Sequence, residues 1–250
     1  MNESLLSSII RKKKTIYFVS PHFDDAVLSA GAVMQYLAKD TNIVVINVFT
    51  QAGERPYSFS VKANLKQSGF TDAKELYQAR EKEDKKVLQK VTKNIINLGF
   101  IDSLWRKKSP SHPLEKIIPE INYLYPTYRF HVAKGKIVKH DLLLMQKIKQ
   151  KLRTIIKEKN PVVFCPMGIG DHVDHVIIRR VCDELFKNPI HWSDFPYNEQ
   201  SAIDTEEYQT LHFERDLKKK KKLIEGYKTQ YNAMFHKGLT LTAEKFFYKK

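Results

Sequence analysis

Two strand-to-helix turns that each carry histidine and aspartate constrain the fold of this chain more than any other feature. The first turn, Ser20-Pro21-His22-Phe23-Asp24-Asp25, follows the apolar run 15–19. The second, His172-Val173-Asp174-His175, follows the apolar run 161–165. A segment with the apolar spacing of an amphipathic helix follows each turn. Because the carboxyl ends of neighbouring parallel strands open onto one crevice, we expect the two turns to meet there.

The segments around these turns predict an α/β protein. After the first turn, helical spacing over 25–39 leads to a β-branched run at 43–49, which completes a β-α-β unit with a right-handed crossover. The second turn continues into a helical pattern ending near 186 and a short strand at 190–192. The fold class we expect is therefore a Rossmann-like open, mainly parallel sheet with helices on both faces.

The length fits one domain, 1–250, with two irregular insertions. A chain of 250 residues can bury a sizeable core as a single unit. Residues 50–72 have turn chemistry without a clear period, and residues 103–140 combine prolines with a concentration of aromatic side chains. We expect both to be loops, the second over the crevice, because long loops in compact domains are often functional. Further helices are expected at 72–93, 141–157 and, as one basic helix, 214–231, and the apolar tail at 246–248 is expected to pack on the domain.

The composition points to a cytoplasmic protein without a membrane span. No apolar run approaches the roughly 20 residues that a membrane-spanning helix needs. The apolar run 5–10 is too short for the core of a signal peptide, and its basic cluster, 11–14, follows it instead of preceding it. Cys165 and Cys182 form neither a disulfide framework nor a thiolate zinc pattern, so we expect both to be small core residues.

The formal charge of +15 raises the question of a nucleic-acid partner. The basic residues are spread along the helical segments, and no nucleic-acid-binding motif accompanies them. We therefore interpret them as solvated faces and expect no specific nucleic acid as a partner. A basic nucleic-acid-binding protein with a vestigial site remains an alternative; it would show salt-sensitive binding and no metal-dependent turnover.

The residues of the two turns are those of a catalytic metal site. Such a zinc site takes three protein ligands from His, Asp and Glu and leaves one position for water. His22, Asp25 and His175 are the obvious set, and His172 is a fourth candidate. Asp24 then lies next to a ligand without being needed as one, which leaves it free for chemistry.

The groups around such a metal suit the hydrolysis of an amide. The metal lowers the pKa of its water to about 7, and Asp24 can take the proton. His172, kept protonated by Asp174, can stabilise the oxyanion and protonate the departing amine. The structural alternatives are that Asp24 or Asp25 only caps the helix, and that His172 and His175 are partly exposed helix residues.

These motifs resemble those of the PIG-L, or LmbE-like, family of zinc-dependent deacetylases. Pro21-His22-Phe23-Asp24-Asp25 resembles the family's P/A-H-x-D-D/E motif, and His172-Val173-Asp174-His175 resembles its H-x-D-H motif. Weaker similarities lie at Arg80 with Glu83, Gly99-Phe100-Ile101-Asp102, Asp194-Phe195-Pro196-Tyr197 and Tyr227-Lys228-Thr229-Gln230. The resemblance implies removal of an acyl group, usually acetyl, from an amino sugar such as N-acetylglucosamine or its conjugate, with Zn²⁺ as the cofactor and Fe²⁺ as the alternative.

The resemblance also implies a role for each site residue. By position, the metal ligands are His22, Asp25 and His175, the general base is Asp24, and the electrostatic pair is His172 and Asp174. Arg80 and Asp102 are implied to contact the sugar or its attached group. The partner expected is a small N-acylated sugar or sugar conjugate, while the oligomeric state stays open.

One departure from the family pattern lies before the second motif. Some members have a tyrosine two residues before H-x-D-H, where this chain has Gly170. Either another residue, such as one from 103–140, supplies that hydroxyl, or His172 works without it. A metal-dependent phosphoesterase is the alternative enzyme class, although it commonly needs two metals and more carboxylates than the two turns supply.

Overall fold

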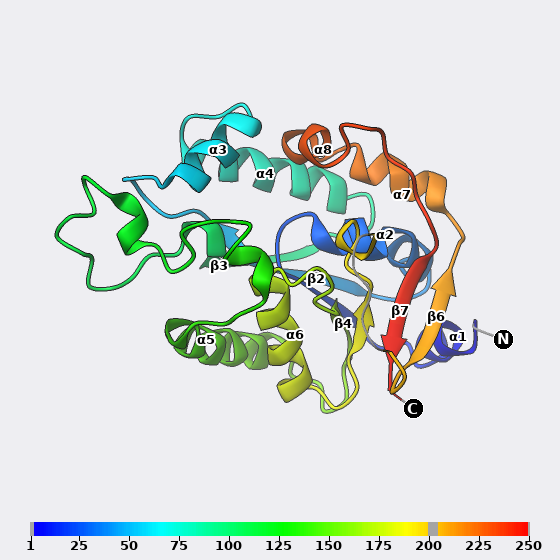
Figure 1. Cartoon of the computed structure of the whole chain (residues 1–250). Helices are drawn as coiled ribbons and strands as arrows, with labels where there is room; N and C mark the ends of the chain where they lie inside the picture. Colours follow the sequence, from blue (N-terminus) through cyan, green and yellow to red (C-terminus); the bar gives the residue numbers. More distant parts are fainter. Residues whose placement is uncertain (1–2, 200–204, 250) are drawn as a thin grey trace.

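The computed structural model describes residues 3–199 and 205–249, and within them one seven-stranded sheet is covered by helices (Figure 1). The strands are β1 (Ile16–Ser20), β2 (Ile43–Gln51), β3 (Asn94–Ile101), β4 (Val162–Pro166), β5 (Ile190–Trp192), β6 (Gln209–Phe213) and β7 (Glu244–Tyr248). The α-helices are α1 (Glu3–Arg11), α2 (Asp25–Leu37), α3 (Phe59–Gln67), α4 (Ala73–Leu88), α5 (Lys139–Ile155), α6 (Val173–Leu185), α7 (Leu217–Ile224) and α8 (Lys228–Met234).

The order of the strands places a topological switch point between β1 and β4. The sheet order is β3-β2-β1-β4-β5-β7-β6. The first five strands in this order are parallel, and β7 is antiparallel to both of its neighbours, β5 and β6. Ile16 of β1 pairs with Ile43 on one side and with Val162 on the other. The chain leaves β1 toward β2 and returns beside β1 as β4, so loops after these two strands border one crevice. The expected Rossmann-like, mainly parallel sheet is confirmed.

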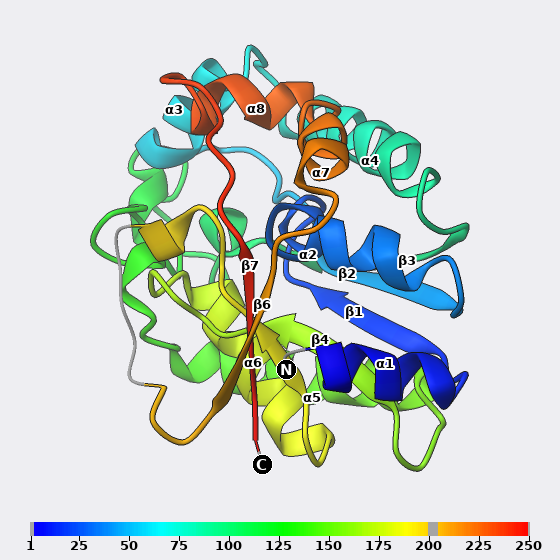
Figure 2. The same ribbon diagram turned by 90° about the vertical axis from the view of Figure 1, so that its right-hand side faces the viewer.

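Helices cover both faces of the sheet, and the strand side chains divide between two cores. Helices α2, α4 and α7 lie over one face, and α5 and α6 lie over the other (Figures 1 and 2). Ile16 and Phe18 pack in the core that contains α2, while Tyr17 and Val19 pack in the core that contains α5 and α6. This alternation is the period of two that a strand buried on both faces requires.

The last strand fixes the middle of α2. The carboxylate of Glu244, at the start of β7, accepts hydrogen bonds from the backbone N–H groups of Ala32 (2.8 Å) and Val33 (2.9 Å). Its charge is balanced by Lys220 of α7, whose Nζ lies 2.9 Å from Oε1. The segment 246–248, expected only to pack on the domain, is part of this strand. The helix that begins at Asp25 is therefore held from the far end of the chain.

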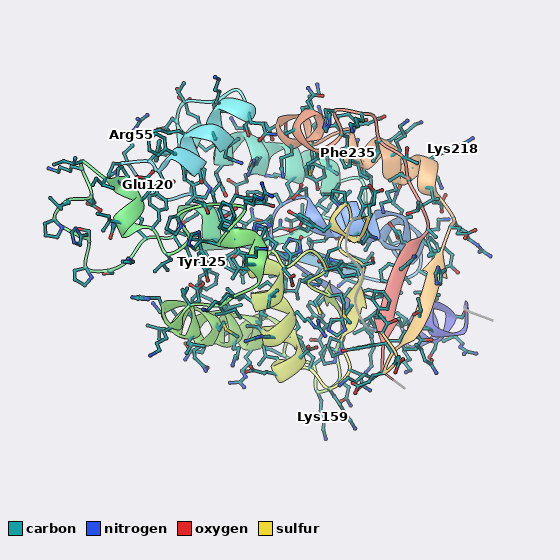
Figure 3. The ribbon with its side chains drawn as sticks, viewed as in Figure 1. Arg55, Glu120, Tyr125, Lys159, Lys218 and Phe235 are labelled. Atoms are coloured by element: carbon teal, nitrogen blue, oxygen red, sulfur yellow. The ribbon has the colours of Figure 1, made fainter. Side chains whose placement is uncertain are left out.

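Residues 50–72 differ from the expected loop because they contain α3. Ser58 begins this helix by accepting a hydrogen bond from the N–H of Val61 through its hydroxyl, and Val61 and Leu65 are buried. Residues 103–140 are irregular as expected, and up to the start of α5 at Lys139 their regular structure is limited to short 3₁₀ turns. Two residues of this insertion, both labelled in Figure 3, attach it to the domain: Glu120 accepts from the N–H of Phe59, and Tyr125 donates to Asp141 of α5.

The single basic helix expected over 214–231 is wrong, because the chain breaks it into α7 and α8. Gly226 lies at the break, and a Cβ there would come within 2.4 Å of the Val87 side chain on α4. The turn thus lets the backbone approach α4 closely before α8 begins, which a continuous helix would not do. The break turns α8 toward the crevice.

The apolar residues near the N-terminus belong to α1. Leu6 and Ile9 of this helix are buried in the core that contains α2. Across the described ranges, no helix combines the length and apolar character needed to cross a bilayer.

Candidate metal centre

The first turn folds so that His22 and Asp25 face one another. The hydroxyl of Ser20 accepts from the N–H of Ala26 (3.0 Å) and donates to the carbonyl of His22 (2.6 Å), which fixes the turn at the end of β1. Oδ2 of Asp25 accepts from the N–H of His22 at 2.8 Å and lies 2.9 Å from its Nδ1. Asp25 therefore orients the imidazole that precedes it.

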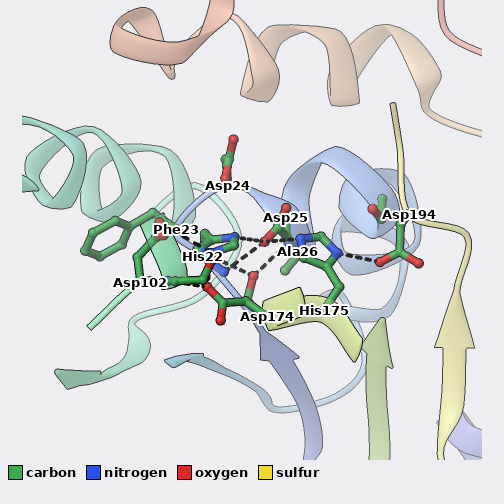
Figure 4. Close-up of polar contacts among 12 residues, drawn as sticks. His22, Phe23, Asp24, Asp25, Ala26, Asp102, Asp174, His175 and Asp194 are labelled. Atoms are coloured by element: carbon green, nitrogen blue, oxygen red, sulfur yellow. Dashed lines mark hydrogen bonds and ion pairs between the residues drawn. The ribbon is translucent and has the colours of Figure 1, made fainter. Parts of the chain in front are cut away.

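The second turn brings His175 to the same carboxylate. After β4, α6 begins at Val173, and Nε2 of His175 lies 3.3 Å from Oδ2 of Asp25. On the other side of the ring, Nδ1 lies 2.8 Å from Oδ1 of Asp194, which follows β5 (Figure 4). The expectation that the two turns meet at the carboxyl ends of β1 and β4 is thus met in the structure.

The donor set of His22, Asp25 and His175 fits a divalent metal. Ligand atoms of these three residues lie within 4.8 Å of one another, and two imidazoles with one carboxylate are a common catalytic zinc set. Nε2 of His175 is buried, and its ion-pair contact is with the other proposed ligand, Oδ2 of Asp25 at 3.3 Å, so a metal held by both groups would replace that contact. A second group, His22 with His172 and Asp174, has similar spacing, but Asp174 is already paired elsewhere.

Charge–charge interactions within this cluster outweigh the effect of burial on the pKa values of its ligand residues. Burial alone lowers the pKa of each imidazole, but Asp25 and Asp102 raise that of His22 well above its usual value. Burial likewise lowers the pKa of His175, yet Asp25 and Asp194 overcome this and raise it to about 10. The two imidazoles in turn outweigh the burial of Asp25 and hold its pKa well below the usual range. Asp25 is therefore ionised, as a metal ligand must be.

Asp24 does not cap α2. Its side chain makes no capping hydrogen bond and points away from Asp25 (Figure 4). It is 3% exposed, and its Oδ2 accepts a hydrogen bond of 2.6 Å from Nε2 of Gln230 on α8. Burial, followed by the charge of Asp25, raises its pKa to about 6. A carboxylate with that pKa is matched to accepting a proton near neutral pH.

The predicted pairing of His172 with Asp174 is not found. Oδ1 of Asp174 lies 2.7 Å from the guanidinium of Arg106, and Oδ2 accepts from the N–H of Ser103 at 2.9 Å. Nδ1 of His172 is buried without a hydrogen-bond partner among the described residues. Burial and the neighbouring His22 and His175 hold the pKa of His172 well below its usual value, so its neutral form is favoured.

A cavity of about 440 Å³ opens beside the cluster. It is lined by His22, Ser60, Ala63, Asn64, Gln67, Ser68, Arg80, Asp102, Leu104, Tyr128, His172, Tyr197, Thr229, Gln230, Ala233 and Met234. Both residues implied to contact the sugar, Arg80 and Asp102, are in this wall. Asp102 accepts a hydrogen bond from the hydroxyl of Tyr77 at 2.8 Å, and Oδ2 lies 3.6 Å from Nε2 of His22.

Two tyrosines occupy the space beside His172. A Cβ at Gly170 would lie 2.5 Å from Cβ of Tyr197, so the tyrosine ring fills the place that a side chain at position 170 would take. The ring centres of Tyr128 and Tyr197 lie 5.9 and 6.2 Å from that of His172, and their hydroxyl oxygens are 3.3 Å apart. Tyr128 comes from the 103–140 insertion, one of the sources considered for the missing hydroxyl.

Sequence reasoning gave no role to three residues that support the site. Asp194 follows β5, so the rule that functional side chains lie at the carboxyl ends of parallel strands predicts a role for it. Gln230 lies in a segment with only a weak family similarity. Arg106, between Asp174 and Asp141, carries no sequence signal because its partners come from distant helices.

Comparisons with known proteins agree with this geometry. The family model PIG-L, described as GlcNAc-PI de-N-acetylase, matches residues 17–186. No curated protein matches the chain significantly. Solved structures that share the fold include three deacetylases.

A deacetylase of teicoplanin biosynthesis has a TM-score of 0.75 at 23% identity, with 94% of this chain and 97% of that chain covered. The zinc-inhibited form of teicoplanin deacetylase has a TM-score of 0.72 at 21% identity, with coverage of 94% and 97%. The N,N'-diacetylchitobiose deacetylase of Pyrococcus horikoshii has a TM-score of 0.50 at 13% identity, with coverage of 92% and 76%.

Proposed function

The chain belongs to the PIG-L family, and we propose that it is a metal-dependent hydrolase that removes an N-acyl group, in the first place acetyl, from an amino sugar or sugar conjugate. It would act on linear amides other than peptide bonds. The names of the structural neighbours, which include deacetylases of teicoplanin biosynthesis and of N,N'-diacetylchitobiose, support this class of substrate.

The observation that carries the proposal is the convergence of His22, Asp25 and His175 next to Asp24, a buried carboxylate that is not needed as a ligand. Their ligand atoms lie within 4.8 Å of one another, and Asp24 is adjacent in sequence to the ligand Asp25. We propose that these three residues hold Zn²⁺, with Fe²⁺ as the alternative ion. Such an ion, when bound, lowers the pKa of water and polarises the carbonyl of the scissile amide.

We assign the proton transfers to Asp24. As a carboxylate it takes a proton from the attacking water, and as an acid it returns a proton to the departing amine. Its pKa of about 6 suits both steps. General acid catalysis by His172 would need an imidazolium, which burial and two neighbouring histidines disfavour. The amine therefore receives its proton from Asp24 in this scheme.

His172 and the two tyrosines are proposed to stabilise the oxyanion. A neutral imidazole has one N–H, which can donate to the oxygen that becomes negative in the tetrahedral transition state. The hydroxyls of Tyr128 and Tyr197, which lie beside His172 in the same wall, can add a second donor. In this scheme they take the place of the tyrosine that some family members have where this chain has Gly170.

The test is metal-dependent release of free amine from N-acetylhexosamines and their nucleotide and lipid conjugates. The protein is first stripped with chelator and then titrated with Zn²⁺ or Fe²⁺ from below one equivalent, because one structural neighbour is described in a zinc-inhibited form. Release that appears with metal and is lost in Asp24→Asn, while the metal stays bound, supports the proposal. No release from any substrate by protein with one bound metal would reject it, and release of phosphate from phosphate esters would indicate the phosphoesterase alternative.

A further inference from the structure

The wall of the cavity contains polar atoms that the protein leaves unpaired. Among the described residues, Oδ1 of Asn64 on α3 and Oε1 of Gln230 on α8 are buried and lack a hydrogen-bond partner. Nε of Arg80 is a buried donor in the same condition. All three residues line the cavity beside the metal ligands. Buried polar groups in folded proteins are almost always paired, so three unpaired groups in one wall indicate that a ligand supplies their partners.

The contact with Asp24 fixes the orientation of the Gln230 amide. An ionised carboxylate only accepts hydrogen bonds, so the group at 2.6 Å from Oδ2 of Asp24 must be the Nε2 donor. The acceptor Oε1 is then left for another partner. One amide group thus contacts the proposed base with one end and is free to accept from a ligand with the other.

Helix α8 is anchored so that this amide is held in place. The hydroxyl of Tyr227 donates to Oδ1 of Asp84 at 2.8 Å, and Asp84 is buried in α4. The hydroxyl of Thr229 donates to Oε2 of Glu83 at 2.7 Å, and its backbone N–H also donates to that carboxylate. Gln230 therefore follows two residues that are fixed to α4.

Helix α3 presents a polar face to the same cavity. Ser60, Ala63, Asn64 and Gln67 line the cavity, while Val61 and Leu65 are buried in the core. Residues 60, 63, 64 and 67 share one helix face because they are three or four positions apart. Asn64 is the member of that face whose side-chain oxygen is both buried and unpaired.

We propose that Asn64 and Gln230 are specificity-determining residues that accept hydrogen bonds from hydroxyl groups of the substrate's sugar. In addition, Gln230 positions Asp24 through the same amide group. This inference rests on the proposed function and names the residues that recognise the hydroxyl groups of its amino-sugar substrate, since a substrate without hydroxyl groups would leave both oxygens unpaired. Two acceptors and the Arg80 donor match a sugar ring, whose hydroxyls both donate and accept.

The first experiment measures equilibrium binding of N-acetylglucosamine and its 3-, 4- and 6-deoxy analogues to the zinc-loaded protein by calorimetry. Asn64→Leu and Gln230→Met keep the approximate size of the side chains and remove the acceptors. We expect each to raise Kd about tenfold, the effect of one lost hydrogen bond. At least one deoxy analogue should bind the wild type more weakly than N-acetylglucosamine does. The same analogue and N-acetylglucosamine should bind Asn64→Leu with equal affinity.

Conservative variants and kinetics separate binding from loss of structure. Asn64→Asp keeps an acceptor oxygen and should bind nearly as the wild type does, and Gln89→Met, an exposed change at the end of α4, serves as the control. On the best substrate of the amine-release panel, Asn64→Leu should raise KM with kcat nearly unchanged. Gln230→Met should also lower kcat, because it frees Asp24.

The outcomes distinguish this inference from the proposed function. Unchanged Kd in both Asn64→Leu and Gln230→Met, or no binding of any N-acetylhexosamine to the wild type, would overturn it. Hexosamine binding that depends on both residues without any amine release would support it and reject the hydrolase proposal. Amine release that neither variant alters would support the hydrolase proposal and reject the role of Asn64 and Gln230.

Discussion

Oδ1 of Asp194 lies 2.8 Å from Nδ1 of His175, while Nε2 of the same ring lies 3.3 Å from the carboxylate of Asp25. The carboxylate of Asp194 also accepts from the N–H of Ile169 at 2.9 Å, which fixes its own position. The imidazole is thus held with Nε2 directed at the proposed metal site. A carboxylate behind a histidine ligand sets its tautomer and increases its basicity.

Asp194→Ala is therefore expected to weaken zinc binding by about 10- to 100-fold. The measurement is a competition titration with a chromophoric chelator at fixed pH. Asp40→Asn, an exposed change just after α2, is the matched control and should bind as the wild type does. Equal zinc affinity of Asp194→Ala and the wild type would show that Asp194 does not support the ligand.

Asp24→Asn should lower kcat by about 10²- to 10⁴-fold, the usual contribution of a positioned acid or base. Zinc stoichiometry should stay at that of the wild type, because the ligands are other residues. Single-turnover amine release and metal analysis of the same samples check both parts. If Asp24→Asn keeps most of its kcat, another group is the base.

Metal binding should release protons at neutral pH. The pKa of His175 is raised to about 10 and that of His22 is also raised, so both imidazoles are protonated at pH 7 before a metal binds. A metal needs the neutral rings, so apparent affinity should increase as pH rises from 6 to 9. Calorimetric titrations in buffers of different ionisation enthalpy count the protons released. Enthalpies that do not depend on the buffer would contradict the expectation.

Arg106→Met should destabilise the fold by about 3–5 kcal/mol, because it leaves two buried carboxylates without their cation. Arg106 is 6% exposed, with guanidinium nitrogens 2.7 Å from Asp174 and 3.1 Å from Asp141. Urea unfolding at pH 7 measures the loss, and Arg153→Met on the exposed side of α5 is the control. A loss no larger than that of the control would mean that the buried carboxylates do not depend on Arg106.

The sequence was sufficient for the parts of the site that lie at strand ends. His22, Asp25 and His175 could be expected together because β1 and β4 are apolar runs of strand length and each ends directly at its motif. The parallel sheet followed from the same alternation of strands and helices. These features are local in sequence, and one rule of topology joins them.

The parts that could not be predicted depend on contacts between distant segments. Asp174 was expected to pair with its near neighbour His172, yet the buried Arg106 attracts it more strongly and comes from an irregular insertion. The break before α8 reflects the close packing of Gly226 on Val87 of α4. The short helix α3 was not predicted because polar residues surround its few apolar positions. Ser58 is its capping residue, and Val61 and Leu65 have the spacing of four that is typical of a helix.

The hydrogen bonds from α2 to Glu244 limit how segments of this chain can be exchanged with those of proteins that share its fold. The family match ends at residue 186, yet Glu244 and Gln230 lie beyond it and contact α2 or the residue just before it. Lys220, also beyond the match, pairs with Glu244. A chimera that joins the matched segment to the C-terminal part of a relative would therefore separate interacting partners in α2 and just before it. The C-terminal segment must be exchanged together with its contacts on α2, so it behaves as part of the same folding unit as the matched segment and not as an interchangeable module.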